Sequence, residues 1–389
     1  MEKQEQIQEK RNILRQSIRG ILTAAAAAAA VFAAVWTMCS LMHTDVRDMW
    51  AEPGGDWDLK ERYNSCVTQA VSNSLEGMEP IRWVWELSDE DLVAPEPNPA
   101  AFGKTADPSG LQWLLDAARE RLGVETAVFS TDTKIMSGSR VTYYLDDSIL
   151  VITWKEVRSG GVYTMSEVKI AHASQFRRYL SDGVYGSNGL YEPSRMAAAV
   201  NAVTACNGDF YMQRSWGVNV YMGQVQNLKK IVDTCYITND GDLIFTRAGE
   251  LETVEEAQTF VDENQVRFSL AFGPVLVENG KNVVPSSYPL GEIDGHYARS
   301  ALCQLGTLHY LLVAVNTENG NRSTPTSYAF ADQLVALGVE KAFSLDGGQS
   351  AAIVTNDRLI NRPTFGEQRR MSDIIYFATA IPEDRWKEE

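Results

Sequence analysis

Four short segments of the chain combine polar or charged side chains with glycines, a combination typical of sites that do chemistry. The first reads Ser344-Leu345-Asp346-Gly347-Gly348-Gln349-Ser350 and follows an apolar stretch of strand length. Its two glycines allow positive φ angles and a close approach of the backbone, so that N–H groups can face an anion. The pattern predicts a ligand-binding turn at the carboxyl end of a strand, where layered α/β domains gather their sites. The alternative is a plain tight turn.

The second segment, Asn207-Gly208-Asp209-Phe210-Tyr211, also ends an apolar stretch. A carboxylate and an amide at a strand end, next to aromatic rings, suit the binding of a sugar. Asn-Gly is also typical of a hairpin corner, so this segment alone leaves both interpretations open.

The third and fourth segments supply cations. One contains His296 and Arg299, within residues 292–301, and the other contains Arg369, within residues 366–373. A guanidinium group recognises phosphate through paired hydrogen bonds, which makes both arginines candidates for phosphate binding. Taken singly, an arginine is more often a solvated surface residue, and a histidine is more often structural.

These segments need a scaffold, and the surrounding sequence predicts one that is rich in strands. Apolar, β-branched and aromatic runs of strand length recur between residues 140 and 378. Helices are predicted at 111–122, 174–181, 193–202 and 326–337. Strands outnumber helices and do not alternate strictly with them. We therefore expect an α+β fold with a mixed β-sheet rather than a doubly wound sheet.

A hydrophobic segment near the N-terminus predicts export. Residues 20–42 carry no charge, and as a helix they span roughly 30 Å, the thickness of a bilayer core. Basic residues precede this segment, whereas Asp45, Asp48 and Glu52 follow it. The positive-inside rule then places residues 1–19 in the cytoplasm and the rest outside, on a single-pass anchor in the cell membrane. The alternative is a cleaved signal peptide, which exports the chain equally.

Residues 43–134 give the weakest signal. They contain a proline-rich stretch at 93–103, typical of an extended linker, and an amphipathic helix at 111–122 that Gly123 terminates. We expect a stalk or accessory segment here. The predicted order is a cytoplasmic tail (1–19), a transmembrane anchor (20–42), the accessory segment (43–134) and the strand-rich domain (135–385).

Charge and cysteine content exclude two classes of site. The formal net charge of -16 argues against a nucleic-acid partner, because phosphate backbones are bound by clustered lysines and arginines. The five cysteines show neither a C-x-x-C nor a Cys/His spacing, so a zinc site has no support. A chain of this size does not need disulfides for stability, and we expect most thiols to be free and buried.

Together, and in this order, the four segments resemble the phosphodiester glycosidase family. Asn207-Gly208-Asp209-Phe210 is similar to the family's Asn-Gly-x-aromatic turn, and Phe272-Gly273-Pro274 is similar to its Phe-Gly-Pro strand. Further similarities are Arg299-Ser300-Ala301, the Leu-Asp-Gly-Gly-x-Ser motif at 345–350 and the Glu-x-Arg motif at 367–369. The resemblance covers residues 135–380. It implies a mixed-sheet α+β domain that hydrolyses a sugar-1-phosphate phosphodiester.

Two departures from the family's pattern limit what the resemblance implies. Asp209 stands where the family often has a second glycine, so this carboxylate is a candidate of this chain rather than of the family. The loop 316–327 contains Pro325 and lacks the Asp-Gly-Arg and Ser-x-Gly usual at this place. We expect that loop to shape the leaving-group side, and the family's substrate is therefore not carried over.

The resemblance implies a reaction through an oxocarbenium-like state, and the roles are assigned accordingly. Asp346 is the principal carboxylate, as base, nucleophile or stabiliser. Asp209 is the second candidate, and His296 is a candidate proton carrier. Arg299 and Arg369 hold the phosphate. The remaining substrate-binding candidates are Asn207, Gly208, the N–H groups of Gly347 and Gly348, and the Ser350 hydroxyl.

The expected activity is hydrolysis of a glycosyl phosphodiester in a cell-surface or extracellular glycan. No cofactor is required for this chemistry, and a divalent cation is compatible with it. Two other classes stay open: a catalytically inactive glycan-binding protein of the cell surface, and a metal-dependent phosphodiesterase with Asp209 and Asp346 as ligands. The catalytic interpretation requires that Asn207, Arg299, Asp346 and Arg369 converge.

Overall fold

The computed structural model describes residues 86–214, 216–289, 293–318 and 323–387. These residues lie in one compact unit, which spans 56–389. The expected tail (1–19) and anchor (20–42) fall outside the described residues. Across the described part, no helix combines the length and the apolar character that a membrane crossing requires.

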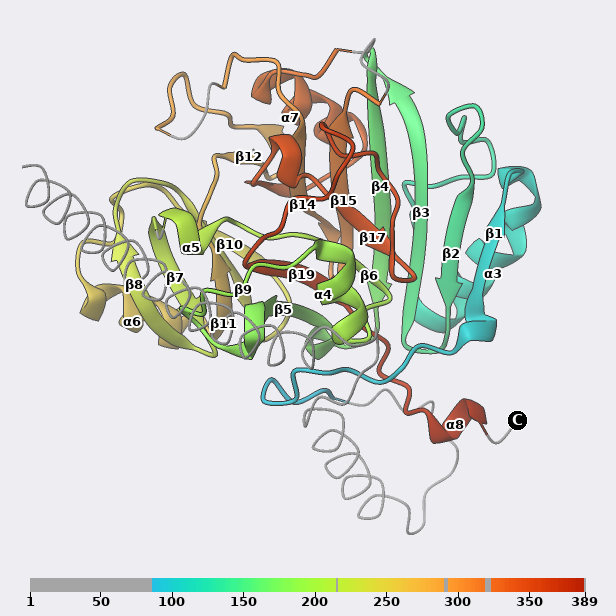
Figure 1. The fold of residues 1–389 in the computed structure, drawn as a ribbon, viewed down its shortest axis with the longest axis horizontal. Coiled ribbons are helices and arrows are strands. Elements are labelled where there is room, and N and C mark those ends of the chain that lie inside the picture. Colours follow the sequence, from blue (N-terminus) through green and yellow to red (C-terminus); the bar gives the residue numbers. More distant parts are fainter. Residues whose placement is uncertain (1–85, 215, 290–292, 319–322, 388–389) are drawn as a thin grey trace, which may run out of the picture. The chain divides into compact units, whose positions relative to one another are not determined.

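The largest element is a nine-stranded sheet in which every neighbouring pair is antiparallel (Figure 1). Its central strands are largely buried, as their content of Val, Ile and Leu predicts. In spatial order the strands are β1 (Phe102–Thr105), β2 (Val141–Leu145), β3 (Ile149–Arg158), β4 (Gly161–Ile170), β15 (His309–Asn316), β14 (Arg299–Gly306), β16 (Lys341–Leu345), β12 (Val275–Glu278) and β13 (Lys281–Asn282).

A five-stranded antiparallel sheet packs against one face of the nine-stranded sheet. Apolar side chains of both sheets share one core, which includes Val151 and Leu312 from the larger sheet and Phe377 from the smaller one. This core fixes the separation of the strand ends that carry the predicted site. In spatial order the strands are β18 (Arg358–Leu359), β17 (Ile353–Thr355), β6 (Thr204–Asn207), β19 (Asp373–Phe377) and β5 (Phe176–Leu180).

Helices cover the outer faces of the two sheets. Leu114 of α3 (Gln112–Leu122) and Phe330 of α7 (Ser327–Ala336) are buried in the core on the outer face of the nine-stranded sheet. α4 (Pro193–Ala199) lies against the five-stranded sheet. The described residues therefore form layers in the order helix, sheet, sheet, helix, which is one of the ways to bury both faces of two sheets.

The chain between β6 and β12 builds a smaller antiparallel part. Its helix, α6 (Val254–Glu263), begins with a capping box in which Thr253 and Glu256 satisfy each other's backbone N–H groups. One-turn helices also occur at α5 (Tyr211–Arg214) and α8 (Asp384–Lys387). The strands are β7 (Gly217–Tyr221), β8 (Gln224–Lys229), β9 (Thr234–Thr238), β10 (Leu243–Thr246) and β11 (Val266–Leu270).

The α+β class is confirmed, and three details differ from expectation. Segment 174–181 is not a helix, because β5 pairs there with β19 and is buried throughout. Strand directions among the described residues are antiparallel rather than mixed, since tight hairpins connect many of the neighbours. β1 and α3, expected in an accessory segment, join the nine-stranded sheet and its core.

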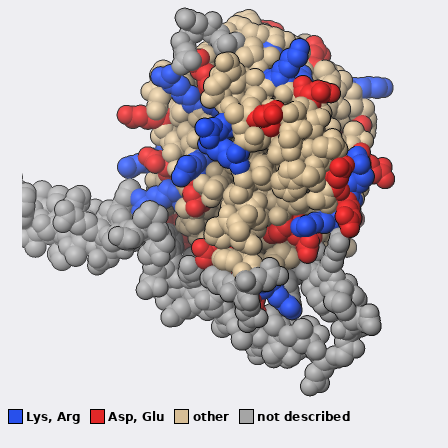
Figure 2. All heavy atoms as spheres, turned by 90° about the vertical axis from the view of Figure 1, so that its right-hand side faces the viewer, with Lys and Arg blue, Asp and Glu red and all other residues tan. Residues whose placement is uncertain are grey.

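Surface charges of both signs are interspersed on the face drawn in Figure 2, which is the right-hand side of Figure 1. Lysine and arginine side chains lie there among aspartate and glutamate side chains.

Cys206, Cys235 and Cys303 are free and buried, which confirms the expectation for these three cysteines. Burial raises the pKa of each of the three thiols. They therefore stay protonated and unreactive in the folded protein. Cys39 and Cys66 fall outside the described residues.

Candidate active site

Two of the predicted segments meet where strands β16 and β6 end. Asp346 directly follows β16, and Asn207 is the last residue of β6 in the facing sheet. The Asn207 side-chain amide donates to the Asp346 carbonyl oxygen over 2.7 Å, and the Asp346 N–H donates to the Gly208 carbonyl oxygen over 3.4 Å. Strand ends that are far apart in the sequence therefore hold the Asp346 turn in place.

Arg369 is the cation at this turn. Its Nη1 lies 3.6 Å from an Asp346 carboxylate oxygen and donates to the Ser350 hydroxyl oxygen over 3.1 Å. Its guanidinium carbon lies 4.6 Å from the centre of the Phe210 ring, within the range of a cation–π interaction. The Arg369 side chain is 37% exposed and that of Asp346 is 15% exposed. The turn thus presents a carboxylate and a cation side by side to solvent.

Asn207 supports the turn from inside the protein. Its side chain is fully buried, and its Oδ1 accepts hydrogen bonds from the Ser300 hydroxyl over 2.8 Å and from the Ala352 N–H over 3.1 Å. The amide nitrogen donates to the Asp346 carbonyl oxygen, so both polar atoms of the side chain form hydrogen bonds within the protein. We therefore correct its role from substrate binding to positioning of Asp346.

The glycines of the turn serve its close packing. The Gly348 N–H donates to the Ala298 carbonyl oxygen over 2.8 Å, so this N–H does not face an anion as expected. A Cβ on Gly347 would lie 2.5 Å from the same oxygen, and Gly348 has a φ of +60°. Ser350 is buried, and its hydroxyl accepts from Arg369. Gly348 and Ser350 therefore shape the turn and orient Arg369.

Arg299 and His296 lie beside the turn on a neighbouring loop. Arg299 begins β14, next to the Ser300–Leu345 pair of the sheet, and donates to the carbonyl oxygens of Gly295 (2.6 Å) and Pro325 (3.3 Å). Burial lowers the pKa of Arg299, and Tyr297 opposes this shift. The His296 Nδ1 lies 2.5 Å from the Thr324 carbonyl oxygen and donates to it. These contacts join residues 293–299 to residues 323–325.

A buried ion cluster lies behind the turn, and the sequence analysis did not predict it. Arg178, on β5, donates from Nε to Asp373 over 3.0 Å, and its Nη2 lies 2.7 Å from Asp209 and 2.8 Å from Asp373. Its Nη1 donates to the Ser269 carbonyl oxygen. All three ionic side chains are at most 3% exposed. We call these residues, Arg178, Asp209 and Asp373, the Arg178 cluster.

Asp209 therefore belongs to the scaffold. One carboxylate oxygen accepts from Arg178 and from the Tyr211 N–H, and the other accepts from the Ala271 N–H over 2.7 Å. Both oxygens are bound by the protein and the side chain is 0% exposed, so these contacts support a structural role rather than the catalytic role that was expected. Burial raises the pKa of Asp209, and the neighbouring Asp373 adds to the rise, whereas Arg178 opposes it.

The Arg178 cluster is packed directly against the site. A Cβ on Gly208 would lie 1.9 Å from an Asp373 carboxylate oxygen, so only glycine fits between this carboxylate and the Asp346 turn. Phe210, which follows Asp209, has a φ of +75° and places its ring against Arg369. A non-glycine residue in this region is strained, and such residues concentrate at functional sites. The cluster thereby fixes both the Gly208 carbonyl and the Phe210 ring.

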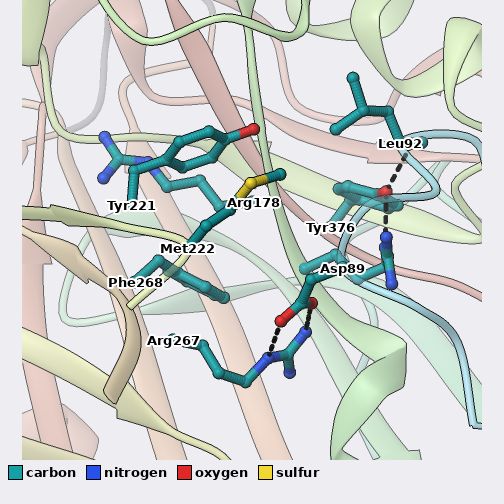
Figure 3. A pocket seen from close by; sticks show the side chains of 9 residues that line it. Asp89, Leu92, Arg178, Tyr221, Met222, Arg267, Phe268 and Tyr376 are labelled. Carbon is teal, nitrogen blue, oxygen red and sulfur yellow. Dashed lines mark hydrogen bonds and ion pairs between the residues drawn. The ribbon is translucent and has the colours of Figure 1, made fainter. Parts of the chain in front are cut away.

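Arg178 also lines a small cavity, together with Arg177 and Arg267 (Figure 3). Arg267 forms two contacts with the Asp89 carboxylate, and Arg177 donates to the Ser88 carbonyl oxygen over 2.9 Å. Segment 87–94 of the same chain therefore already binds both arginines. The residues that line the cavity are Asp89, Leu92, Arg177, Arg178, Tyr221, Met222, Arg267, Phe268 and Tyr376, and no predicted site residue is among them.

Comparisons with known proteins add a family and two solved structures. Residues 200–378 match the sequence profile of phosphodiester glycosidases, and this range contains all ten predicted site residues. The chain is similar to the catalytic domain of zebrafish N-acetylglucosamine-1-phosphodiester alpha-N-acetylglucosaminidase, auto-inhibited by its pro-peptide (17% identity, 59% of this chain, 82% of that chain, TM-score 0.48). It is also similar to a hypothetical protein from Synechocystis (16% identity, 64% of each chain, TM-score 0.44). No curated protein sequence matches.

Proposed function

Residues 200–378 form a phosphodiester glycosidase domain, which makes the chain a hydrolase of the glycosidase class, and from this premise we propose its substrate and its location. The substrate is a sugar-1-phosphate phosphodiester in a cell-surface or extracellular glycan. The domain works outside the cytoplasm, on the anchor expected at residues 20–42. The sequence pattern of that segment supports the location, and the family supports the bond that is cleaved.

One observation carries the proposal: Asp346, on the turn after β16, lies 3.6 Å from Arg369, on the segment before β19, and both side chains are partly exposed. A phosphodiester brings a negative charge that Arg369 can bind through its guanidinium group. Phosphate bound there places the anomeric carbon of the sugar next to the Asp346 carboxylate. Asp346 and Arg369 therefore supply the carboxylate and the cation that the reaction needs.

Hydrolysis breaks the bond between the anomeric carbon and the phosphate oxygen, and a water molecule supplies the hydroxyl that the sugar gains. The carbon passes through an oxocarbenium-like state that a carboxylate stabilises. Asp346 acts here as base, nucleophile or stabiliser. Phosphate is a good leaving group once its charge is neutralised, so Arg369 contributes more than a proton donor would.

The other residues act around this pair. Asn207 and Gly208 position Asp346 through the hydrogen bonds to its backbone, and Ser350 orients Arg369. Arg299, at the start of β14, is a second cation for the phosphate. His296, on the preceding loop, stays a candidate proton carrier.

The Asp346→Asn variant tests the catalytic proposal. We expect at least a 100-fold loss of kcat on a sugar-1-phosphodiester, because one proton-transfer group contributes roughly 10²–10⁴. The circular dichroism spectrum should stay that of the wild type. Asp357→Asn is the matched control, since Asp357 has a φ of +58°, which asparagine tolerates.

Other outcomes identify the other classes of function. Wild-type protein that binds a glycan with saturable affinity but releases no sugar is a binding protein. Activity that a chelator abolishes indicates a metal-dependent enzyme, whereas the proposed enzyme needs no cofactor and keeps its activity. Protease treatment of intact cells tests the location, because an extracytoplasmic domain is digested while residues 1–19 are protected.

A further inference from the structure

Three aromatic side chains of the described residues are exposed: Trp113, Tyr297 and Phe365. Two of them, Tyr297 and Phe365, flank the Asp346 turn. The connecting residue is Gly348, whose N–H donates to the Ala298 carbonyl oxygen and whose carbonyl oxygen accepts from the Thr364 hydroxyl over 3.0 Å. Each of these two contacts is made by the direct chain neighbour of an exposed aromatic residue.

Phe365 is the most exposed of the three, at 76%. It sits at the tip of a tight turn in which the Gly366 N–H donates to the Pro363 carbonyl oxygen over 3.0 Å. Burying a phenylalanine side chain contributes about 1.5–3 kcal/mol, and the fold forgoes most of this stabilisation at Phe365. The turn is nevertheless attached to the site by Thr364, so the ring is held at a defined place beside Gly348.

Tyr297 is held in a different way. It is 46% exposed, and the Arg299 guanidinium carbon lies 5.6 Å from its ring centre. This contact is a cation–π interaction, which restrains the ring on the loop that packs against Gly348. Tyr297 and Phe365 are therefore both anchored beside the turn that carries Asp346, although they belong to separate loops.

Aromatic faces are the usual partners of sugar rings. The face of the π system is negative, and it attracts the positive C–H groups that one side of a pyranose ring exposes. From this placement, we infer that Tyr297 and Phe365 form sugar-stacking subsites on two sides of the Asp346 turn. The enzyme then takes an extended glycan, with sugar rings beyond the one it releases. This inference rests on the proposed function and specifies its substrate class.

Kinetics with three probes test the inference. The minimal probe is the methyl phosphodiester of N-acetylglucosamine 1-phosphate. The second carries a trisaccharide on the sugar side, and the third carries a trisaccharide on the phosphate side. We expect Phe365→Ala and Tyr297→Ala each to raise KM about 10-fold for at least one extended probe. For Phe365→Ala, the kcat values and the KM of the minimal probe should not change.

Two controls separate stacking from a structural effect. Phe365→Trp and Tyr297→Phe should restore the KM of the wild type, because an aromatic face is all that stacking requires. Trp113→Ala removes an aromatic residue that is 53% exposed on α3 and should leave every KM unchanged. Equal effects of the alanine variants on all three probes, or no effect on either extended probe, would overturn the inference.

A binding experiment distinguishes failure of the stacking subsites from failure of the hydrolytic proposal. The Asp346→Asn protein is titrated calorimetrically with the unphosphorylated trisaccharide, with and without the Phe365→Ala change. Weaker binding with alanine supports the stacking subsites even when no probe is hydrolysed, in which case only the hydrolytic proposal fails. Binding that is identical in both proteins contradicts the subsites whatever the activity.

Discussion

At the scale of single residues, the site depends on how Arg369 is held. Its guanidinium group contacts Asp346, the Ser350 hydroxyl and the face of Phe210 at the same time. A planar group with several donors can do this, whereas a compact ammonium group cannot. The geometry therefore requires arginine in particular, and not merely a positive charge.

The Arg369→Lys variant tests this requirement. We expect kcat/KM to fall roughly 100-fold, because the charge stays but the stacking on Phe210 and the hydrogen bond to Ser350 are lost. Steady-state kinetics on a sugar-1-phosphodiester give the measurement. Arg370→Lys, at the next and exposed position, is the control and should behave as the wild type. Equal activity of both variants would mean that charge alone suffices.

The pH dependence of stability should report on Asp209. Burial raises the folded-state pKa of Asp209 above the ordinary 3.8, so the fold favours the protonated carboxyl. Its contribution is fully present below the ordinary pKa and is lost as pH rises through the raised pKa. The urea midpoint of the wild type, measured relative to that of Asp209→Asn, should therefore decrease as the pH rises above about 4. A difference between the two midpoints that stays constant with pH would contradict the raised pKa.

At the scale of elements, the Arg178 cluster joins three strands and one turn. Arg178 lies on β5, Asp373 on β19 and Asp209 after β6, and the Ser269 carbonyl on β11 receives the remaining donor. One cation thus compensates two buried carboxylates. The positions of these strands set the position of Gly208, on which the Asp346 turn rests.

Removal of the Arg178 cation should lower the free energy of unfolding far more than removal of a surface charge. Arg178→Met leaves Asp209 and Asp373 buried without their cation, and we expect a loss of about 3–5 kcal/mol in the free energy of unfolding. Chemical denaturation followed by circular dichroism measures it. Arg119→Met, which removes an exposed pair with Asp116, should cost less than about 1 kcal/mol. Similar losses for both variants would contradict the role of the cluster.

The sequence could predict the turn but not what supports it. Gly347 and Gly348 after an apolar run indicate a tight turn from local rules alone, and Gly123 likewise marks the end of α3, where it adopts a φ of +66°. Arg178 was missed because its segment was assigned to a helix. Two adjacent arginines in a buried strand contradict local preference, and only partners distant in sequence make them stable there: Asp209 and Asp373 for Arg178, and the Tyr376 hydroxyl and Ser88 carbonyl oxygen for Arg177.

At the scale of the whole described chain, segment 87–94 lies along the domain instead of extending from it. The Leu87 N–H donates to the Ser174 hydroxyl over 2.9 Å, and Tyr376 donates to the Leu92 carbonyl oxygen over 3.0 Å. Arg267 holds the Asp89 carboxylate. The segment expected as a stalk is, from residue 86 onward, part of the domain.

Asp89→Asn should loosen this segment without unfolding the domain. The change removes the ion pair with Arg267, whereas Arg267 keeps its hydrogen bonds to the Ala173 and Phe176 carbonyl oxygens. We expect proteinase K to cleave within residues 86–95 several-fold faster than in the wild type, at a nearly unchanged Tm. Glu90→Gln, at the adjacent exposed position, is the control and should leave the cleavage rate as it is.

The contact between Gly208 and Asp373 has a consequence for how homologous sequences can diverge. A side chain at position 208 would overlap the Asp373 carboxylate, and loss of Asp373 would deprive Arg178 of one of its two carboxylate partners. Either substitution alone gives a destabilised protein, so selection should couple positions 208 and 373. In an alignment of relatives, residues larger than glycine at 208 should appear only where 373 has become smaller. Free variation at 208 beside an unchanged aspartate at 373 would refute this coupling.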